Sequence, residues 1–466
     1  MFSSTGKARS LRAIALMLLG SAALAPAGAT DLREAIAVAV QSNPQINQAV
    51  ANKEAIEFER EQAQGLYRPR VSVEASAGAR RTDTPTRRVL GSDDDVLAPV
   101  EGSLLVEQTL FDSGARRAEL SRQAARTDGA ANRVEERSQF IALEVARRYI
   151  DYLLQQRIVA AADDNITFHR KLTDDLREGV RSGSISIADQ QQAEERLQAS
   201  LARRTEAQEE LTNAAISFRT LTGLPLDSAT VPPALTAKLP ATLEDAIAAA
   251  RTNNPLVREA MADIDAAYAV RDAAKANLGP RVALEGRARY GQDVDGFRGH
   301  ASDLYGRVVA RWNLYTGGID QANVQESTRR ASETRFRLHE VTRQAEEDAR
   351  TAWNRLRSQA GLVGDLDRQR AVADDLIVSY REQFNVGRRS LLDLLDSQNT
   401  RYNVVVQAET ARLAELFAQY RVLASTNELL AAVDVAPQKA AIAGARARFD
   451  VKVTPAAEVM ERRLPN

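Results

Sequence analysis

"LREAIAVAVQSNP", residues 32–44, recurs in altered form as "LEDAIAAARTNNP", residues 243–255. Both copies are amphipathic stretches that end in Asn-Pro, and Asn43 and Asn254 are 211 positions apart. Asparagine is a favoured N-cap and proline fits the first helical turn, so each Asn-Pro pair predicts that a new helix begins there. The same helix junction therefore occurs twice in the chain, which indicates an internal duplication.

Other landmarks recur at nearly the same distance along almost the whole chain. They are "PRV" at 69–71 and 280–282 (211 apart), "LFDSG" at 110–114 and "LYTGG" at 314–318 (204 apart), Gly183 and Gly387 (204 apart), and Asp189 and Asp393 (204 apart). The spacing changes once, between residues 80 and 105, where the first half holds seven additional residues. Chance similarity between two segments would not keep the spacing of so many landmarks constant. The seven additional residues are expected in a surface loop, where insertions are tolerated. We expect a first repeat over 30–241, a second over 242–430 and a tail over 431–466.

The first 29 residues have the pattern of an export signal. Three basic residues, Lys7, Arg9 and Arg12, precede a short apolar run at 13–25 and the small residues at 27–29. An uncleaved membrane anchor is the alternative, but the run is short for crossing a bilayer. No other stretch has the apolar length of a transmembrane helix, so in an exported chain any membrane crossing must use strands.

The composition favours long helices over a loop-rich enzyme. The 466 residues include only 24 glycines and 14 prolines, with 27% charged residues. The net charge of −1 argues against a nucleic-acid partner. The absence of cysteine excludes disulfides, thiolate catalysis and a lipidated N-terminal cysteine. The sequence has no histidine cluster, phosphate-binding glycine loop or catalytic constellation, so we expect no enzyme activity, cofactor or metal.

Two stretches without proline predict very long helices. No proline occurs from 100 to 224 or from 281 to 436, and proline breaks helix interiors. We expect helices over about 115–181 and 319–384, each roughly 100 Å long at ~1.5 Å per residue, followed by a glycine turn and a returning helix. Apolar residues step by three and four, as in coiled coils, at Leu143, Ala146, Ile150 and Leu153 and at Leu413, Leu416, Tyr420 and Leu423.

Between the short and the long helices of each repeat, the apolar residues alternate. The stretches 71–79 and 282–290 have this period of two, and 102–111 and 303–315 are the expected returning strands. Strands of about ten residues are long enough to cross a bilayer at a tilt. An ordinary surface hairpin, half buried on a core, is the alternative that periodicity alone does not exclude. If the strands span a membrane, the loop at 80–101 is extracellular.

Two repeats give four strands per chain, which are too few to close a barrel. Open strand edges are not tolerated in lipid, because their backbone groups would lack hydrogen-bond partners. Several copies of the chain must therefore share one barrel. The strand count does not give the number of copies.

With these features, residues 31–430 resemble the TolC family of outer-membrane channel-tunnels. The resemblance rests on the duplication, the Asn-Pro helix starts, the "LFDSG" and "LYTGG" joints and the turn "VGRRSLLDLLD" at 386–396. It implies a mainly α fold with β: a homotrimer with a 12-stranded outer-membrane β-barrel, continued by a long periplasmic α-helical barrel. The implied partners are outer-membrane lipid, a periplasmic adaptor protein and an inner-membrane ABC transporter or proton-driven pump.

The turns at Gly183 and Gly387 are expected at the periplasmic tip, farthest from the strands. The resemblance implies that Asp393 and Asp396 form rings of carboxylates in the trimer, and such rings attract cations. It also implies that Asp189 and Arg389 hold the gate closed and that the adaptor docks around the two glycines.

Two features qualify this comparison. Phe384 stands where the family often has a gate tyrosine, and Ala188 lacks a hydroxyl at another gate position, so this tip is expected to be held shut less tightly or by other pairs. The spacings Ser186-x-x-Asp189 and Ser390-x-x-Asp393 are also those of capping boxes, which only start a helix. For Asp189 and Asp393 the two roles remain open, whereas Asp396 lies beyond the cap.

The leading hypothesis is a passive outer-membrane exit duct for type I secretion of proteins such as adhesins or toxins. The missing N-terminal cysteine favours this branch over lipidated drug-efflux channels. The alternatives are the outer-membrane part of a multidrug or metal efflux pump and a soluble periplasmic coiled-coil scaffold. The tail at 431–466 has no strong period and is expected to be a partly disordered periplasmic extension that can wrap around the helices.

Overall fold

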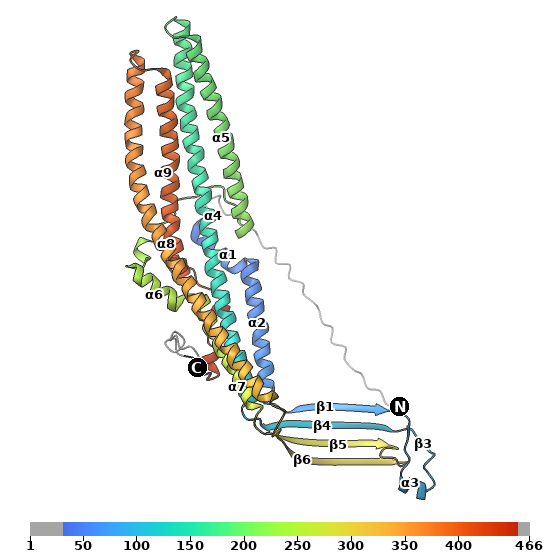
Figure 1. Ribbon diagram of the computed structural model, residues 1–466. Helices are drawn as coiled ribbons and strands as arrows, with labels where there is room; N and C mark the ends of the chain where they lie inside the picture. Colours follow the sequence, from blue (N-terminus) through green and yellow to red (C-terminus); the bar gives the residue numbers. More distant parts are fainter. Residues whose placement is uncertain (1–30, 455–466) are drawn as a thin grey trace, which may run out of the picture.

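The computed structural model describes residues 31–454 and has the same order of elements twice (Figure 1). The first set is α1 (Leu32–Ser42), α2 (Pro44–Gly65), β1 (Arg70–Ala77), β4 (Val100–Phe111), α4 (Ala115–Arg181) and α5 (Ile187–Thr222). The second is α6 (Leu243–Asn253), α7 (Pro255–Ala276), β5 (Arg281–Gln292), β6 (His300–Arg311), α8 (Ile319–Asn385) and α9 (Leu391–Ser425). The export signal predicted at 1–29 lies outside the described residues.

The molecule is elongated, with the strands at one end and two helical hairpins at the other (Figure 1). Helices α4 and α8 have 67 residues each, with bounds within one residue of those predicted. The hairpins α4–α5 and α8–α9 place their turns at the end of the molecule that is far from the sheet. Among residues 31–454, no helix combines the length and the apolar character that a membrane span needs.

The Asn-Pro pairs start helices, as predicted. Asn43 caps α2 by accepting the backbone N–H of Gln45, and Asn254 caps α7 by accepting that of Leu256. Pro44 and Pro255 occupy the first helical position in each case. Each junction lets a short helix end and a new one begin in another direction without leaving the first backbone donors unpaired.

The four long strands form one antiparallel sheet in the order β1-β4-β5-β6. The central β4–β5 pair joins the two repeats. Strand β6 ends at Arg311, so the predicted strand 303–315 was too long. The apolar alternation continues past Arg311, but Gly317 and Gly318 have φ of 68° and 84° and begin the turn into α8, and the Trp312 indole N–H donates to the carbonyl of Leu278 at 3.0 Å.

The two faces of this sheet differ in chemistry. One face carries mainly apolar or small residues: Val71, Val73, Leu104, Val106, Leu284, Ala288, Leu304 and Val308. The other carries the charged residues: Glu74, Glu101, Glu107, Glu285, Arg287, Arg289, Asp303, Arg307 and Arg311. Within the single chain Val73 is 77% exposed and Leu304 83% exposed. An open apolar face of this kind is typical of a surface that contacts another protein or a membrane.

The insertion at 80–101 is folded against the turn between strands β5 and β6. It contains β2 (Arg80–Arg81), the short helix α3 (Pro85–Val89) and β3 (Val96–Leu97), which pairs with β2. Arg87 is 2% exposed and donates to the carbonyl oxygens of Ser92 and Gly296, each at 2.9 Å. A buried arginine that satisfies carbonyls on both sides fixes the two outer loops relative to each other.

The largest apolar core lies where α1, α4, α5 and α9 meet. The predicted coiled-coil positions are part of it: Ala146, Ile150, Leu153, Leu413, Leu416, Tyr420 and Leu423 are buried, and Leu143 packs against them. Phe218 is fully buried and meets Tyr149 edge to face, with ring centroids 6.1 Å apart. The Tyr149 hydroxyl donates to the carbonyl of Thr230 at 3.1 Å, which attaches the linker between the repeats.

The tail packs on the helices over 431–454, where the sequence predicts partial disorder. From the end of the second repeat onward the chain forms α10 (Leu429–Ala432), the 3-10 helix η2 (Lys439–Ala441) and α11 (Ala445–Arg448). Leu430, Val435 and Ala441 belong to the main core. Isolated apolar side chains anchor these short elements, and such anchoring leaves no periodic signal in the sequence.

We predict that Phe218→Ala lowers the free energy of unfolding by about 3–5 kcal/mol, because it removes a large side chain from a closed core. Ile216→Ala, on the same helix but at a 59% exposed position, should cost less than about 1 kcal/mol. Denaturant titration in detergent, followed by circular dichroism, measures both. Equal losses in the two variants would contradict the assignment of the core.

Candidate functional site

The candidate site is the tip formed by the two helical hairpins. Gly183, between α4 and α5, has φ of 77°, and Gly387, between α8 and α9, has φ of 70°. No atom lies within 4 Å of a Cβ built on either glycine, so only the left-handed backbone requires glycine there. Both turns are exposed. The prediction that glycines end the long helices is confirmed.

Asp189 and Asp393 serve the starts of the returning helices. Ser186 caps α5 by accepting the backbone N–H of Asp189 at 3.1 Å, and its hydroxyl donates to the Asp189 carboxylate at 2.7 Å. Ser390 and Asp393 repeat this pair at 3.2 and 2.9 Å. Neither carboxylate accepts the backbone N–H of its serine in the described chain, so the complete capping box is not formed, but both aspartates have a role at a helix start. A ring role for Asp393 would have to coexist with it.

Asp396 differs from Asp393 although it is only one turn further along α9. Its side chain is exposed, and within residues 31–454 it takes part in no hydrogen bond or ion pair. Its negative charge is therefore not compensated by a neighbour in the chain. Exposed, uncompensated carboxylates contribute more to a local field than paired ones.

Arg389 and Phe384 are held within the tip of the second hairpin. The Arg389 guanidinium lies 4.2 Å from the ring centroid of Tyr380, and its Nε donates to the side chain of Gln383 at 3.2 Å. Its Nη1 is 3.7 Å from the Asp393 carboxylate. Phe384 packs against a buried cluster of Leu172, Leu176, Ala193, Ile377, Leu391, Leu394 and Leu395. A single chain does not bring Arg389 to Asp189.

The apolar cluster behind the tip joins the two hairpins, because its members come from α4, α5, α8 and α9. An ion pair between Arg381 of α8 and Asp175 of α4, at 2.9 Å, crosses the same boundary. Within the first hairpin, Arg177 binds Glu194 at 2.8 Å, and this contact lowers the pKa of the Glu194 carboxyl. Apolar packing and charge pairs thus hold the two hairpins side by side in the chain.

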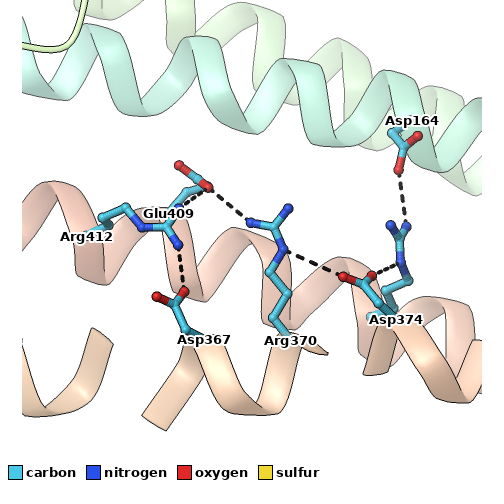
Figure 2. A network of polar contacts seen from close by, with 7 residues as sticks. Asp164, Asp367, Arg370, Asp374, Glu409 and Arg412 are labelled. Atoms are coloured by element: carbon cyan, nitrogen blue, oxygen red, sulfur yellow. Dashed lines mark hydrogen bonds and ion pairs between the residues drawn. The ribbon is translucent and has the colours of Figure 1, made fainter. Parts of the chain in front are cut away.

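Sequence reasoning missed a ladder of ion pairs further behind the tip, shown in Figure 2. Arg401 of α9 binds Asp164 of α4 at 3.1 Å and Asp374 of α8 at 2.5 Å. The ladder continues through Arg370–Glu409 (3.4 Å), Arg412–Glu409 (2.8 Å) and Arg412–Asp367 (2.6 Å). The partners Asp164 and Arg401 are 237 positions apart, so no local spacing reveals them. Exposed pairs add little stability, and here they fix how α9 lies against α4 and α8.

A buried polar group lies between α4 and α9 near this ladder. The Gln398 amide donates to Asn165 at 2.8 Å, and both side chains are less than 5% exposed. His169, one turn along α4, is 5% exposed and its Nδ1 has no hydrogen-bond partner. Burial lowers the pKa of His169 to about 4, and the nearby Arg196 and Arg203 act in the same direction. The imidazole is therefore neutral in the folded chain at neutral pH.

We predict that His169 makes the protein less stable in acid. Its folded pKa is below the unfolded value near 6.5, so the unfolded chain takes up the proton first and stability falls as the pH drops from about 6.5 towards 4. Between pH 6.5 and 4.5 this one group should cost about 2 kcal/mol per chain. Unfolding of the wild type and of His169→Leu at both pH values measures the effect. An identical acid loss in the two proteins would contradict it.

Among residues 31–454, no three His, Asp or Glu side chains are grouped as a metal site would require.

Comparison with known proteins defines the class of protein to which the chain belongs. The model of the outer membrane efflux protein family matches residues 35–224 and again 246–435, two segments that are 211 positions apart, like the two Asn-Pro pairs. The chain belongs to this family, and the resemblance to TolC-type channels is confirmed.

Particular relatives are distant but cover most of the chain. It is 22% identical to the outer membrane efflux protein BepC of Brucella suis biovar 1, over 91% of each chain. It is 23% identical to the alkaline protease secretion protein AprF of Pseudomonas aeruginosa, over 84% of this chain and 83% of AprF. Its fold matches the CmeC outer membrane channel of Campylobacter jejuni with a TM-score of 0.74 at 14% identity, over 85% and 86% of the two chains.

Proposed function

We propose that the chain is the outer-membrane exit duct of a tripartite type I secretion system, a passive conduit with an iris-like gate at its periplasmic tip. The observation that carries this proposal is the sheet, which is apolar on one face, charged on the other, and has no partner at its outer strands β1 and β6 within the described chain. Its distance from the tip along helices of 67 residues suits a duct that crosses the periplasm.

The sheet supports a shared barrel in the outer membrane. Four strands cannot close on themselves, whereas three copies would supply a 12-stranded barrel with no free edge. The face with Val73 and Leu304 would meet lipid. The face with Glu285 and Arg307, paired at 2.8 Å, would line the water-filled interior. This arrangement satisfies both faces and both edges at once.

The residues at the tip are consistent with a gate and with contacts to partner proteins. In a homotrimer, Asp393 and Asp396 would each form a ring of three carboxylates, and Asp189, Phe384 and Arg389 would contribute to the closed state. The exposed turns at Gly183 and Gly387 would be the contact points of a periplasmic adaptor. Energy for transport would come from an inner-membrane ABC transporter, because the chain has no nucleotide-binding motif.

The name of AprF describes secretion of a protease, and the name of BepC describes efflux. Their identities to this chain are nearly equal, so the cysteine-free sequence is what favours secretion. The second candidate is the outer-membrane component of a multidrug or metal efflux pump driven by protons. Both candidates use the same duct and differ in the transporter behind it.

We predict that replacing both Asp393 and Asp396 with alanine lowers the cation-to-anion permeability ratio of single channels at least about threefold, because the rings that concentrate cations would be lost. Block by millimolar trivalent cations at the periplasmic side should weaken in parallel. Planar-bilayer recordings under a salt gradient measure both quantities. Glu61→Ala, an exposed carboxylate on α2 far from the tip, is the control and should behave as wild type. Unchanged selectivity and block in the double variant would reject the rings.

Deleting the gene in its native host distinguishes secretion from efflux. We expect a protein to disappear from the culture medium while drug and metal tolerance stay within about twofold of the parent strain, because the proposed duct serves a protein exporter and not a drug or metal pump. Plasmid-borne wild-type protein should restore export. Loss of tolerance with a normal set of extracellular proteins would favour the efflux pump instead.

A further inference from the structure

The tail residues 444–454 occupy a site on two helices that belong to different repeats. The site consists of Asp128 on α4 and Asp265 on α7, each only 4% exposed. Aspartates are rarely buried this deeply unless their charge is compensated. The hydrogen-bond donors to both carboxylates come from the tail, which lies outside the duplicated part of the sequence.

Asp128 is held by a small cradle of donors. The backbone N–H groups of Gly444 and Ala445 donate to its Oδ1 at 2.8 and 2.7 Å. The backbone N–H and the Nε of Arg446 donate to its Oδ2 at 3.2 and 2.9 Å. Three consecutive backbone donors and one guanidinium around a single carboxylate form a built binding site rather than a chance surface contact.

Asp265 is held by the same arginine and by the end of the described tail. Arg446 Nη1 donates to its Oδ2 at 2.6 Å, and the backbone N–H and hydroxyl of Thr454 donate to its Oδ1 at 3.0 and 2.8 Å. One guanidinium thus neutralises a carboxylate from each repeat. Lysine, with a point charge, would not bridge two carboxylates in this fixed geometry.

Further contacts hold the tail across the first repeat. The guanidinium groups of Arg60 on α2 and of Arg448 lie 5.3 and 5.6 Å from the centroid of the Phe449 ring. The Gln438 amide donates to the carbonyl of Val40 on α1 at 2.6 Å. Small residues let α4 and α7 approach at this level, since a Cβ on Gly129 would lie 3.7 Å from that of Ala262.

The two aspartates are separated from the sheet by nearly the same number of residues along their helices. Asp128 comes 17 positions after Phe111, the last residue of β4, and Asp265 comes 16 positions before Arg281, the first residue of β5. Strands β4 and β5 are the pair that joins the two repeats. At the positions equivalent by duplication stand Ser332 and Glu54, so this pair of acceptors is not a remnant of the repeat.

We propose that Asp128 and Asp265 form a binding site for the chain's own segment 444–454, and that docking of this segment sets the spacing of α4 and α7 needed for the sheet to join other copies. The second half rests on the proposed shared barrel. Segment 444–454 follows both repeats in the sequence and binds one aspartate from each. It can therefore dock fully only when both repeats are present. Assembly is thereby restricted to chains whose repeats are already joined.

The test uses the full chain with Asp128→Asn and Asp265→Asn together. These changes remove both negative charges. The Arg446 guanidinium does not remain buried without a partner, because it can move into solvent together with the tail. We expect trypsin to cut after Arg448 about tenfold faster, since a released tail is open to protease, and the oligomer fraction in native electrophoresis in detergent to fall about fivefold. Asp272→Asn, an exposed acid on α7, is the control and should match wild type in both assays.

A second variant keeps the test independent of the helices. Ala445→Pro removes the N–H that binds Asp128, at a first helical position that proline tolerates, and it should reproduce both effects even if the double variant loses helicity in circular dichroism. Unchanged cleavage would reject the binding site. Faster cleavage with wild-type amounts of oligomer would reject the role in assembly. A monomeric wild-type protein would instead refute the proposed shared barrel and leave the cleavage result to decide the site.

Discussion

The free backbone groups along the outer edges of β1 and β6 are the constraint on which the rest of the structure depends. In the described chain each of these strands has one neighbour, and neither face of the sheet is covered by helices (Figure 1). In lipid such edges must be paired, because no water is present to satisfy them. In the proposed barrel, other copies of the chain would pair these edges, and the long helices, the tip and the tail would be arranged around that assembly.

Duplication explains why the two halves of the chain have the same elements in the same order. Each repeat contributes one strand hairpin and one helical hairpin, and the β4–β5 pair keeps the strand pattern continuous across the junction. The helical hairpins are joined less uniformly. Behind the tip, α4 meets α9 through the apolar cluster around Leu394, the buried Gln398–Asn165 bond and the pair Arg401–Asp164. Buried hydrogen bonds at such a boundary fix the register between the two hairpins. The apolar cluster at this boundary has fewer buried residues than the main core.

The sequence predicted what local chemistry determines. Proline-free stretches and glycine turns gave α4 and α8 nearly to the residue, and serine caps gave the starts of α5 and α9. Long-range pairs could not be predicted this way: Asp164 and Arg401 meet only because two hairpins lie side by side, and Asp128 and Arg446 only because the tail returns to α4. The end of β6 was missed because Trp312, Leu314 and Tyr315 look like strand residues, while the glycines after them decide the turn.

Asp393 and Asp396, the two aspartates that follow the Gly387 turn, show why position alone does not assign a role. Asp393 accepts the Ser390 hydroxyl and lies 3.7 Å from Arg389, so part of its field is cancelled where it arises. Asp396 has no such neighbour in the described chain and is exposed. In a three-fold duct the ring at Asp396 would therefore carry most of the attraction for cations, whereas the ring at Asp393 would mainly hold the helix start and the arginine in place. The repeat supports this division, because Asp189 has the capping serine as well, but Gln192 stands where Asp396 would recur.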